Sequence, residues 1–480
     1  MMRRLVRFVD QRTGTAPLLR KQLRYLFPDH WSFLLGEVAL YAFLVLVATG
    51  TYLALFYHDS TADVVYHGPY VPLQGQHMTD AYRSVLDIST SVKAGLLIRQ
   101  THHWAADVFI AAIVLHLLRV FFTGAYRKPR ELTYWIGVTL LGVALLEGFL
   151  GYSLVDDLLS GMGLAIGNAV ALSIPFAGGN LGSLLWQGPF PGGHDFFARM
   201  YIAHVFLIPA LIAVLLTAHL ALVALKHHTQ FKSGPRESER RVVGMPAFPG
   251  QAPRSVGLLL AVAGVLVLLG GLVQINPIWL WGPFHTYSST NGAQPDWYLG
   301  WLIGALRLMP GFDVTIGDYT LVPNPFWGGA ALPLLVFGLL YLWPWLERKA
   351  SGDQAGHNVL QRPRDAPVRT AVGVGVVTAV FVVFLAGSSD RVNVSYGLGY
   401  EGQIWLYRVL FFLGPIVAAA IAHRVCLELQ RGEEVERRRR LAERAAREEA
   451  ARGRAASAGV GTRAGQVEGD EGTRLSREHS

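Results

Sequence analysis

Two apolar stretches of this sequence each carry two histidines at nearly the same spacing. His102 and His116 are fourteen residues apart, and His204 and His219 are fifteen residues apart. On an α-helix these separations advance the chain by about 21 and 22 Å and return both side chains to nearly the same face. Two such helices side by side place His102 opposite His204 at one depth and His116 opposite His219 at another.

Imidazole pairs that face each other across two helices suit haem iron, because they fill both axial positions and leave none for oxygen or a substrate. A site of that kind transfers electrons. A lone histidine in an apolar helix is more often hydrogen-bonded to a neighbour, so the inference depends on the two matched pairs. His103 adjoins His102 and competes with it as a ligand, but the matched spacing favours His102. Since Cys426 is the only cysteine, cysteine-ligated clusters and covalent haem attachment are excluded.

Glycines repeat the histidine spacing in two other apolar stretches. Gly36 and Gly50 are fourteen residues apart, as are Gly137 and Gly151. A planar macrocycle needs room between helices, and glycines at its depth would provide that room. Glycine also serves close helix packing alone, which is an equally good explanation for any single pair. Agreement with the histidine spacing favours the cofactor explanation.

Three charged residues lie in or beside the same stretches. Arg99 and Arg119 are each three residues from a proposed ligand histidine and could meet haem propionates through charge-assisted hydrogen bonds. For Arg119 a general preference for basic residues at the inner membrane surface explains the position nearly as well. Glu147 precedes Gly151 by one helical turn. It is either a proton-handling group or a neutral, hydrogen-bonded acid.

The elements that must position these residues are membrane-spanning helices. The chain is 52% hydrophobic, and its first 427 residues hold only 53 charged residues. Charged residues are therefore about half as frequent in this part of the chain as in soluble domains. We therefore predict an all-α integral membrane protein with eight transmembrane helices, the first four forming a bundle around two haems. The predicted spans are Phe33–Tyr57, Thr101–Thr123, Leu132–Leu154, Ala198–Leu225, Ser255–Ile275, Phe326–Leu346, Ala371–Ala386 and Ile404–Ile421.

Basic residues collect in alternate loops, which predicts that both termini are cytoplasmic. The chain then divides into five segments: a basic N-terminus (1–28), a di-haem module (29–230), a cytoplasmic linker (231–254), a second module (255–427) and a charged tail (428–480). The tail is expected to be a short charged helix that grades into disorder. We see no removable signal peptide and no internal repeat.

These residues together resemble the cytochrome b subunit of the bc1 and b6f quinol-oxidising complexes. The resemblance covers nearly all of residues 30–425 and rests on the histidines, the glycines and three further motifs: GAYRKPRELTYWIGV (124–138), GYSLVDDLLSG (151–161) and QPDWY (294–298). The last is similar to the family's PEWY signature, with Asp296 in place of Glu. The run NPIWLWGPF before it resembles the form found in actinobacterial menaquinol complexes.

The resemblance implies the subunit of a quinol–cytochrome c reductase in a bacterial cell membrane. Asp296 and Tyr298 would act on quinol at the outer side, with Pro295 and Trp297 beside them. Two non-covalent b-type haems, at His102/His204 and His116/His219, would carry electrons inward while protons are released outside. A Rieske iron–sulfur protein and a c-type cytochrome would be separate subunits, the quinol would be menaquinol, and the complex would be a homodimer. No nucleic-acid partner is expected.

The chain departs from the family pattern at two places. Val155 stands where proline is usual. Ala224 stands where the mitochondrial pattern has an inner-site histidine; His228 is the nearest replacement, or a surface histidine without a role. Three rival functions remain: a proton-coupled transporter, a di-haem anchor of another redox complex, and a divergent paralogue that no longer oxidises quinol.

Overall fold

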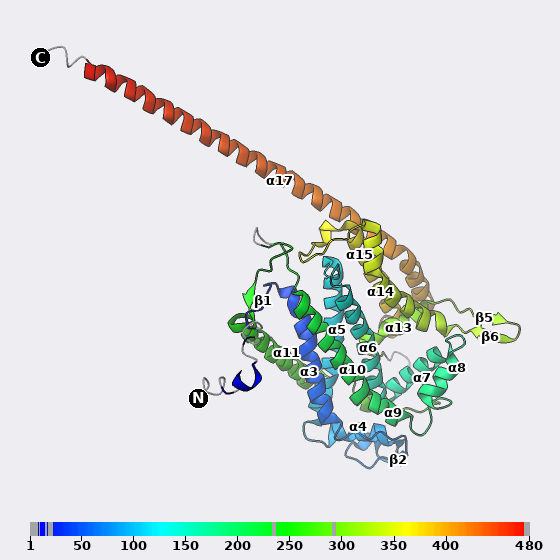
Figure 1. Cartoon of the computed structure of the whole chain (residues 1–480). Coiled ribbons are helices and arrows are strands. Elements are labelled where there is room, and N and C mark those ends of the chain that lie inside the picture. Colours follow the sequence, from blue (N-terminus) through cyan, green and yellow to red (C-terminus); the bar gives the residue numbers. More distant parts are fainter. Residues whose placement is uncertain are drawn as a thin grey trace.

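The computed structural model describes residues 8, 10–14, 17, 23–232, 237–289 and 294–474. The predicted basic segment 1–28 and the end of the tail lie largely outside these residues. Within them, eight helices are long and apolar enough to cross a membrane (Figure 1). They are Trp31–Leu53, Gly95–Thr123, Glu131–Ser153, Phe196–Lys226, Ala247–Leu272, Trp327–Ser351, Pro367–Gly387 and Tyr400–Arg452. The predicted all-α membrane fold with eight spans is confirmed.

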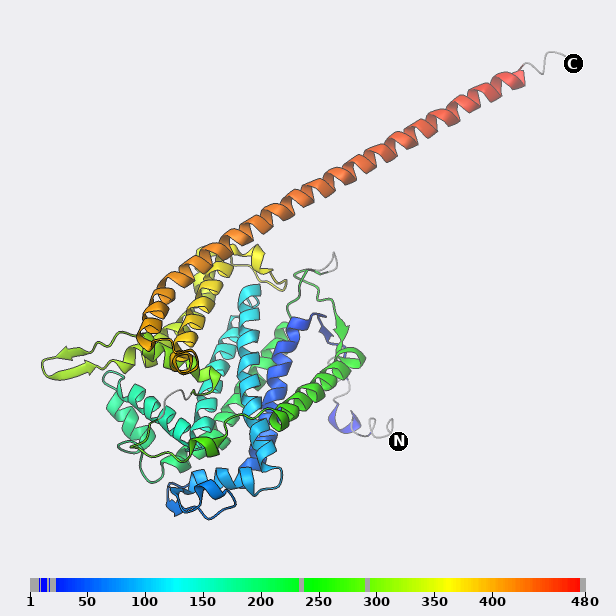
Figure 2. The same cartoon turned by 180° about the vertical axis from the view of Figure 1, so that it is seen from behind.

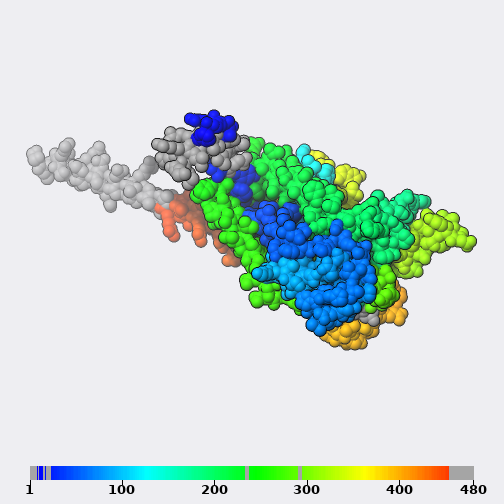
Figure 3. All heavy atoms as spheres, turned by 90° about the horizontal axis from the view of Figure 1, so that it is seen from below, coloured from blue at the N-terminus to red at the C-terminus, as the bar shows by residue number. Residues whose placement is uncertain are grey.

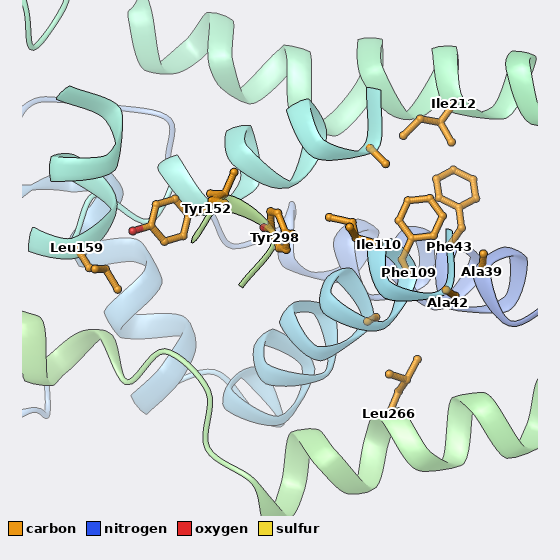
Figure 4. Packing of buried hydrophobic residues seen from close by; sticks show 14 residues of the cluster. Ala39, Ala42, Phe43, Phe109, Ile110, Tyr152, Leu159, Ile212, Leu266 and Tyr298 are labelled. Atoms are coloured by element: carbon orange, nitrogen blue, oxygen red, sulfur yellow. The ribbon is translucent and has the colours of Figure 1, made fainter. Parts of the chain in front are cut away.

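The first four spans form a bundle. They comprise α3 (Leu34–Leu53) after the short η1 (Trp31–Phe33), then α5 (Gly95–Thr123), α6 (Glu131–Ser153), and a fourth span built from α9 (Phe196–Ile202), η3 (Ala203–Leu207) and α10 (Ile208–Lys226). Helix α3 packs along α5, and α10 packs along α6. The core between them is filled by Ala39, Phe43, Phe109 and Ile212, with the two phenyl rings 5.7 Å apart (Figure 4).

The second four spans flank this bundle. They are η4 (Ala247–Gln251) with α11 (Ala252–Leu272), η5 (Trp327–Ala331) with α14 (Leu332–Ser351), α15 (Pro367–Gly387) and the first part of α17 (Tyr400–Arg474). Helix α11 packs against α5 and α3, while α15 packs mainly against α17 and against the short α13 (Trp297–Leu308). Most side chains along α10, α11 and α17 are exposed, as expected for apolar helices in contact with lipid.

One end of the bundle is covered by the longer loops (Figures 1 and 3). Strands β2 (Asp63–Val65) and β3 (His77–Thr79) pair antiparallel, with η2 (Val71–Leu73) between them, and lead into α4 (Asp80–Thr90). Helices α7 (Leu158–Leu172), α8 (Gly178–Trp186) and α12 (Ile278–Trp281) follow at the same end, and β5 (Val314–Ile316) with β6 (Tyr319–Val322) forms a projecting hairpin (Figure 2). We call this the loop end.

The opposite end carries the basic loops, and we call it the basic end. Here β1 (Leu26–Phe27) pairs with β4 (Met245–Pro246), and η6 (Pro363–Asp365) precedes α15. Helix α16 (Ser389–Tyr396) lies back toward the loop end, before α17. Helix α17 continues past the predicted tail boundary at residue 428 without a break, so the charged helix is longer than expected (Figure 2). Ion pairs one turn apart, such as Arg438 with Glu434 at 2.8 Å, stabilise it.

Two predicted spans begin later than the helices do. The seventh was predicted from Ala371, whereas α15 begins at Pro367 because Arg369 is buried against Glu347 rather than ending the helix. The fifth was predicted from Ser255, whereas helical structure begins at Ala247. Hydropathy does not detect a charged residue that is neutralised by a partner far along the chain.

Candidate functional site

The first pair of histidines meets near the loop end of the bundle. The ring centroids of His102 on α5 and His204 in the fourth span are 6.3 Å apart, and the rings are nearly perpendicular. Each ring lies over a glycine of a neighbouring helix. A Cβ atom at Gly50 would stand 3.1 Å from the Cε1 atom of His102, and one at Gly151 would stand 2.5 Å from that of His204.

Thr49 fixes the tautomer of His102. The Thr49 hydroxyl donates to the carbonyl oxygen of Val45 at 2.7 Å, so its oxygen is left to accept from the Nδ1–H of His102 at 2.9 Å. The Nε2 atom of His102 then has a free lone pair. Ligand histidines in metal sites are usually oriented through the second nitrogen in this way. The sequence analysis missed Thr49, whose only signal is its position beside Gly50.

Glu147 occupies the equivalent position beside His204. The Nδ1 atom of His204 lies 2.9 Å from the Oε1 atom of Glu147, and both side chains are largely buried. The other carboxylate oxygen of Glu147 has no hydrogen-bond partner among the described residues. The contact is an ion-pair distance without hydrogen-bond geometry, and it leaves the Nε2 atom of His204 available as a ligand. Thr49 therefore orients one outer imidazole by a hydrogen bond, and Glu147 lies beside the corresponding nitrogen of the other.

A π-helical turn explains the unequal histidine spacing. The turn η3 (Ala203–Leu207) begins just before His204, and the backbone N–H of Ile208 donates to the carbonyl of Ala203, five residues back. Such a turn accommodates one extra residue within a helix. The fifteen residues from His204 to His219 therefore cover the distance that fourteen residues cover in α5, and both histidines stay on one face.

The second pair of histidines lines a cavity of about 690 Å³ toward the basic end. His116 and His219 contribute to its wall, together with Gly36 and Gly137. A Cβ at Gly36 would stand 3.3 Å from the Cε1 atom of His116, and one at Gly137 would stand 3.6 Å from that of His219. The volume falls within the range of ligand and cofactor pockets, about 300–1,000 Å³.

Two arginines beside the histidines differ in what they contact. Arg119 lines the cavity, lies 4.3 Å from the ring centroid of Phe33, and has Nε and one terminal nitrogen buried without a partner among the described residues. Arg99 instead donates to the Ser89 hydroxyl at 3.0 Å and to the Asn276 carbonyl at 3.3 Å. A buried cation with unused donors next to a pair of imidazoles fits a haem propionate, so the inner site has the chemistry that a b-type haem requires.

The QPDWY motif lies beside the outer pair. One carboxylate oxygen of Asp296 accepts a hydrogen bond from the Tyr298 hydroxyl at 2.9 Å. The other oxygen lies 2.6 Å from the Nε2 atom of His103. The tyrosine is buried, and its ring occupies the space that a Cβ at Gly148 would need. His103, the competing ligand candidate, thus contacts the carboxylate, while its neighbour His102 faces His204.

Other members of this site lie close by in sequence. Pro295 and Trp297 flank Asp296, and the Trp297 side chain is partly exposed. Asp107 follows His103 by one turn of α5 and is buried, with one oxygen unpaired among the described residues. The sequence analysis missed Asp107, which its four-residue spacing from His103 could have revealed. Val155 packs into a cluster around Tyr82.

Two further carboxylates follow Val155 at the loop end. Burial raises the pKa of Asp156 to about 7, although the Thr79 hydroxyl donates to it at 2.6 Å. Burial also raises the pKa of Asp157 to about 6, against the opposing effect of its hydrogen bonds with Ser160. Asp157 caps the N-terminus of α7 through the Ser160 backbone N–H at 2.8 Å. Their hydrogen bonds to Thr79 and Ser160 hold the loop between α6 and α7, and Asp157 also acts electrostatically on Arg99 and His103.

His228 lies in the wall of the inner cavity, just past the end of α10. Its Nδ1 atom is 3.2 Å from the hydroxyl of Tyr25, and its ring packs at 4.9 Å from that of Phe27. Burial, followed by the charges of Arg119 and Arg130, lowers the pKa of His228 to about 4. The side chain is therefore neutral at physiological pH and able to accept or donate a hydrogen bond to a ligand in the cavity.

Comparison with known proteins gives consistent matches. The family model described as "Cytochrome b(N-terminal)/b6/petB" matches residues 107–283. A cytochrome bc1 complex cytochrome b subunit of Streptomyces coelicolor is 45% identical over 432 residues, which are 89% of this chain and 78% of the relative. Those of Mycobacterium leprae and Corynebacterium diphtheriae are 45% and 44% identical, over 88% of this chain and 77% and 78% of the relatives.

A solved structure titled "Hyperthermophilic respiratory Complex III" has a similar fold. The superposition has a TM-score of 0.64 at 19% sequence identity and covers 87% of this chain and 98% of the other. At that identity the likeness concerns the fold alone.

Proposed function

Because the chain belongs to the family of cytochrome b subunits of bc1 complexes, we propose that it is the quinol-oxidising subunit of a quinol–cytochrome c reductase. Membership makes it an oxidoreductase component and a multi-pass membrane protein. The observation that carries the finer proposal is the arrangement of four histidines at two levels, each ring over a glycine. Two separated sites on one bundle suit electron transfer across a membrane.

Membership of the cytochrome b family implies that the chain binds haem b, and we place one haem at each level. His102 and His204 would hold the outer haem, oriented by Thr49 and Glu147. His116 and His219 would hold the inner one, with Arg119 for a propionate. The haems would supply one-electron carriers at both depths. Arg99 is the weaker candidate for a propionate contact, because its donors already contact Ser89 and Asn276.

The outer quinol site would use the hydrogen-bonded group around Asp296. Its carboxylate, held between Tyr298 and His103, is placed to accept a proton from a quinol hydroxyl, and Tyr298 to hold the quinol oxygen. Pro295 and Trp297 would form the entrance. Release of that proton on the loop end, taken as the outside, gives proton translocation its direction.

The inner quinone site would lie in the cavity beside the second histidine pair. His228 and Tyr25 form a polar couple in its wall, surrounded by aromatic rings. A quinone carbonyl needs a hydrogen-bond donor in an otherwise apolar pocket, and neutral His228 can supply one. By analogy with its actinobacterial relatives, we propose menaquinone as the natural quinone.

The same proposal includes partners and a location. A Rieske iron–sulfur protein and a c-type cytochrome would accept electrons leaving the outer site, since this chain has a single cysteine. We place the complex in a bacterial cell membrane as a homodimer, with both termini of this chain in the cytoplasm. The basic loops lie together at one end of the bundle, which supports that orientation.

A redox-poised optical spectrum of the purified complex tests the haem assignment. We expect two b-type haems with separate midpoints in the unmodified complex, one haem in a His102→Ala variant, and two in a His103→Gln variant. The third protein is the matched control, because His103 is adjacent to His102 but contacts Asp296 instead. Loss of a haem from His103→Gln with retention in His102→Ala would reverse the ligand assignment.

A quinol oxidation assay separates the proposal from its rivals. An Asp296→Asn variant should keep both haems and reduce cytochrome c about a hundredfold more slowly, as expected for loss of a general base. A di-haem anchor of another complex, or a paralogue without quinol oxidation, predicts two haems and no cytochrome c reduction even in the unmodified complex. A transporter predicts no haem at all.

A further inference from the structure

A second cavity, of about 210 Å³, lies at the basic end of the bundle. Its wall combines the loop between α5 and α6, the last turns of α14, the segment after α14 and the start of α15. The inner histidines do not line it. Its charged lining consists of Arg127, Lys128, Arg348 and Arg369 against Glu131, Glu347 and Asp353, with His357 beside them. Basic groups therefore outnumber acidic ones in this small, partly open cavity.

Arg369 is the most deeply buried of these cations. Its side chain is 4% exposed, its Nε donates to Glu347 at 2.7 Å, and one terminal nitrogen donates to Gln361 at 2.8 Å. The other terminal nitrogen, NH1, is buried and has no partner among the described residues. A buried donor of a charged group without an acceptor is costly. Arg369 is thus a residue of the cavity lining with one guanidinium donor unused among the described residues.

Arg127 lies next to this donor and has no paired carboxylate among the described residues. Both guanidinium groups approach the space that a Cβ at Gly124 would occupy. Within the part of the chain that the structure describes, Arg127 donates only to the backbone carbonyls of Gly124 at 3.1 Å and Val359 at 3.2 Å. Burial, followed by the charge of Arg369, lowers its pKa, although Glu347 and Asp353 act in the opposite direction. Two guanidinium groups held together in this way favour an anion between them.

The carboxylates of the cavity have other partners. Glu347 also receives the hydroxyl of Tyr126, Glu131 pairs with Arg348 at 3.4 Å, and Asp353 contacts His357 at 2.7 Å. Lys128 contacts only a carbonyl, that of Gln354 at 3.4 Å. The lining thus has one more basic group than carboxylates, and Arg127 and Lys128 form no ion pair within the described part of the chain.

We propose that this cavity binds a phosphate group. A guanidinium fork matches the tetrahedral oxygens of phosphate, and the ammonium of Lys128 adds a flexible donor at the rim. The cavity lies where four apolar helices end, at the level of lipid headgroups, and basic pockets between helix ends are typical sites for anionic headgroups. The phosphate therefore comes either from an anionic phospholipid or from solution.

Thermal unfolding of the delipidated complex, followed by tryptophan fluorescence, tests the proposal. The probes are inorganic phosphate, and a short-chain phosphatidylglycerol, each compared with chloride at equal ionic strength. The test variant is Arg127→Gln, and the matched control is Lys349→Gln. Lys349 is a cation at the same end of the bundle, but it lies outside the cavity lining and stacks on Trp345. Native mass spectrometry of the same samples counts bound phospholipid, and the haem spectrum reports the fold independently.

We expect a saturable rise in the unfolding temperature of the unmodified complex and of Lys349→Gln. Arg127→Gln should need at least about tenfold more ligand, as expected for one lost charge-assisted contact. Saturation by phosphate alone would identify a soluble anion as the source, and saturation by lipid alone a headgroup. No specific shift with either probe, or an equal loss in both variants, would overturn the proposal. If Arg127→Gln loses haem, Lys128→Gln replaces it in the same comparison.

Discussion

The four glycines opposite the histidines leave different amounts of room. A Cβ added at Gly151 would approach its histidine to 2.5 Å, which a ring cannot tolerate without moving. At Gly137 the corresponding distance is 3.6 Å, an ordinary van der Waals contact. Gly50 and Gly36 lie between these extremes, at 3.1 and 3.3 Å. Glycines with equal spacing in the sequence therefore differ in how much room the neighbouring histidine leaves for a side chain.

This difference predicts a graded effect of alanine substitution on haem content. Gly151→Ala should displace His204 and lose the outer haem, because overpacking of a tight contact costs about 1–3 kcal/mol. Gly137→Ala should keep both haems. Optical difference spectra of the purified complexes measure the outcome, with Gly338→Ala as control, since nothing lies within 4 Å of a Cβ at that position of α14. Equal haem content in Gly151→Ala and Gly137→Ala would contradict the packing argument.

Residue types and spacing predicted which histidines face each other, but not which other side chains contact them. The histidine pairs could be inferred because each lies on a helix long enough to return it to the same face. Thr49, Glu147 and His103 could not be assigned, since their contacts depend on the rotation of one helix against another. The matched spacing favoured His102 over His103, but only that rotation shows what each contacts: His102 faces His204, and His103 faces Asp296.

At the scale of elements, the spans could be predicted because twenty apolar residues in sequence are a strong signal. The fold elements that complete the sites were not predictable in this way. Helix α13 has only 12 residues, yet it carries Tyr298. The π-turn η3 has no distinctive composition, and the start of α15 depends on the buried contact between Arg369 and Glu347. Each of these depends on tertiary contacts that local hydropathy does not record.

The π-turn leads to a prediction about single-residue deletions. Deleting Phe206 removes the extra residue of η3, so the fourth span should become a regular helix with its histidines fourteen residues apart, as in α5. Deleting Leu115 from α5, which has no such turn, should rotate His116 by about 100° relative to His102. Both side chains are exposed, so their own packing contributes little.

Haem content again measures the result. The Phe206 deletion should retain two haems, and the Leu115 deletion should lose at least one. The two deletions are matched controls for each other, because each removes one large apolar residue between two of the proposed ligand histidines. If the Phe206 deletion lost as much haem as the Leu115 deletion, the turn would not be the reason that fifteen residues replace fourteen.

At the scale of the whole molecule, the two ends of the bundle differ in charge and in length of loop. The loops at the basic end include Arg127, Lys128 and Arg130, and the last of these donates to the carbonyls of Lys226, His227 and His357. These bonds join three basic-end segments into one surface. The inner cavity and the proposed phosphate site both open near it, so the orientation of the bundle decides which compartment each site faces.

An even number of spans predicts that both termini lie on the same side of the membrane as the basic end. The positive-inside rule predicts that this side is the cytoplasm. Reporter fusions on either side of α15 give the sharpest test, since α15 was the shortest predicted span. Alkaline phosphatase fused after Gly397 should be active, because that point follows seven spans, whereas phosphatase fused after Gly356 should be inactive. Green fluorescent protein should fluoresce after Gly356 and after Ser480. Phosphatase after Gly75, which follows one span, is the positive control. Matching activity after Gly356 and Gly397 would mean that α15 does not cross the membrane, and the long charged helix α17 would then continue outside the cell, against the positive-inside rule.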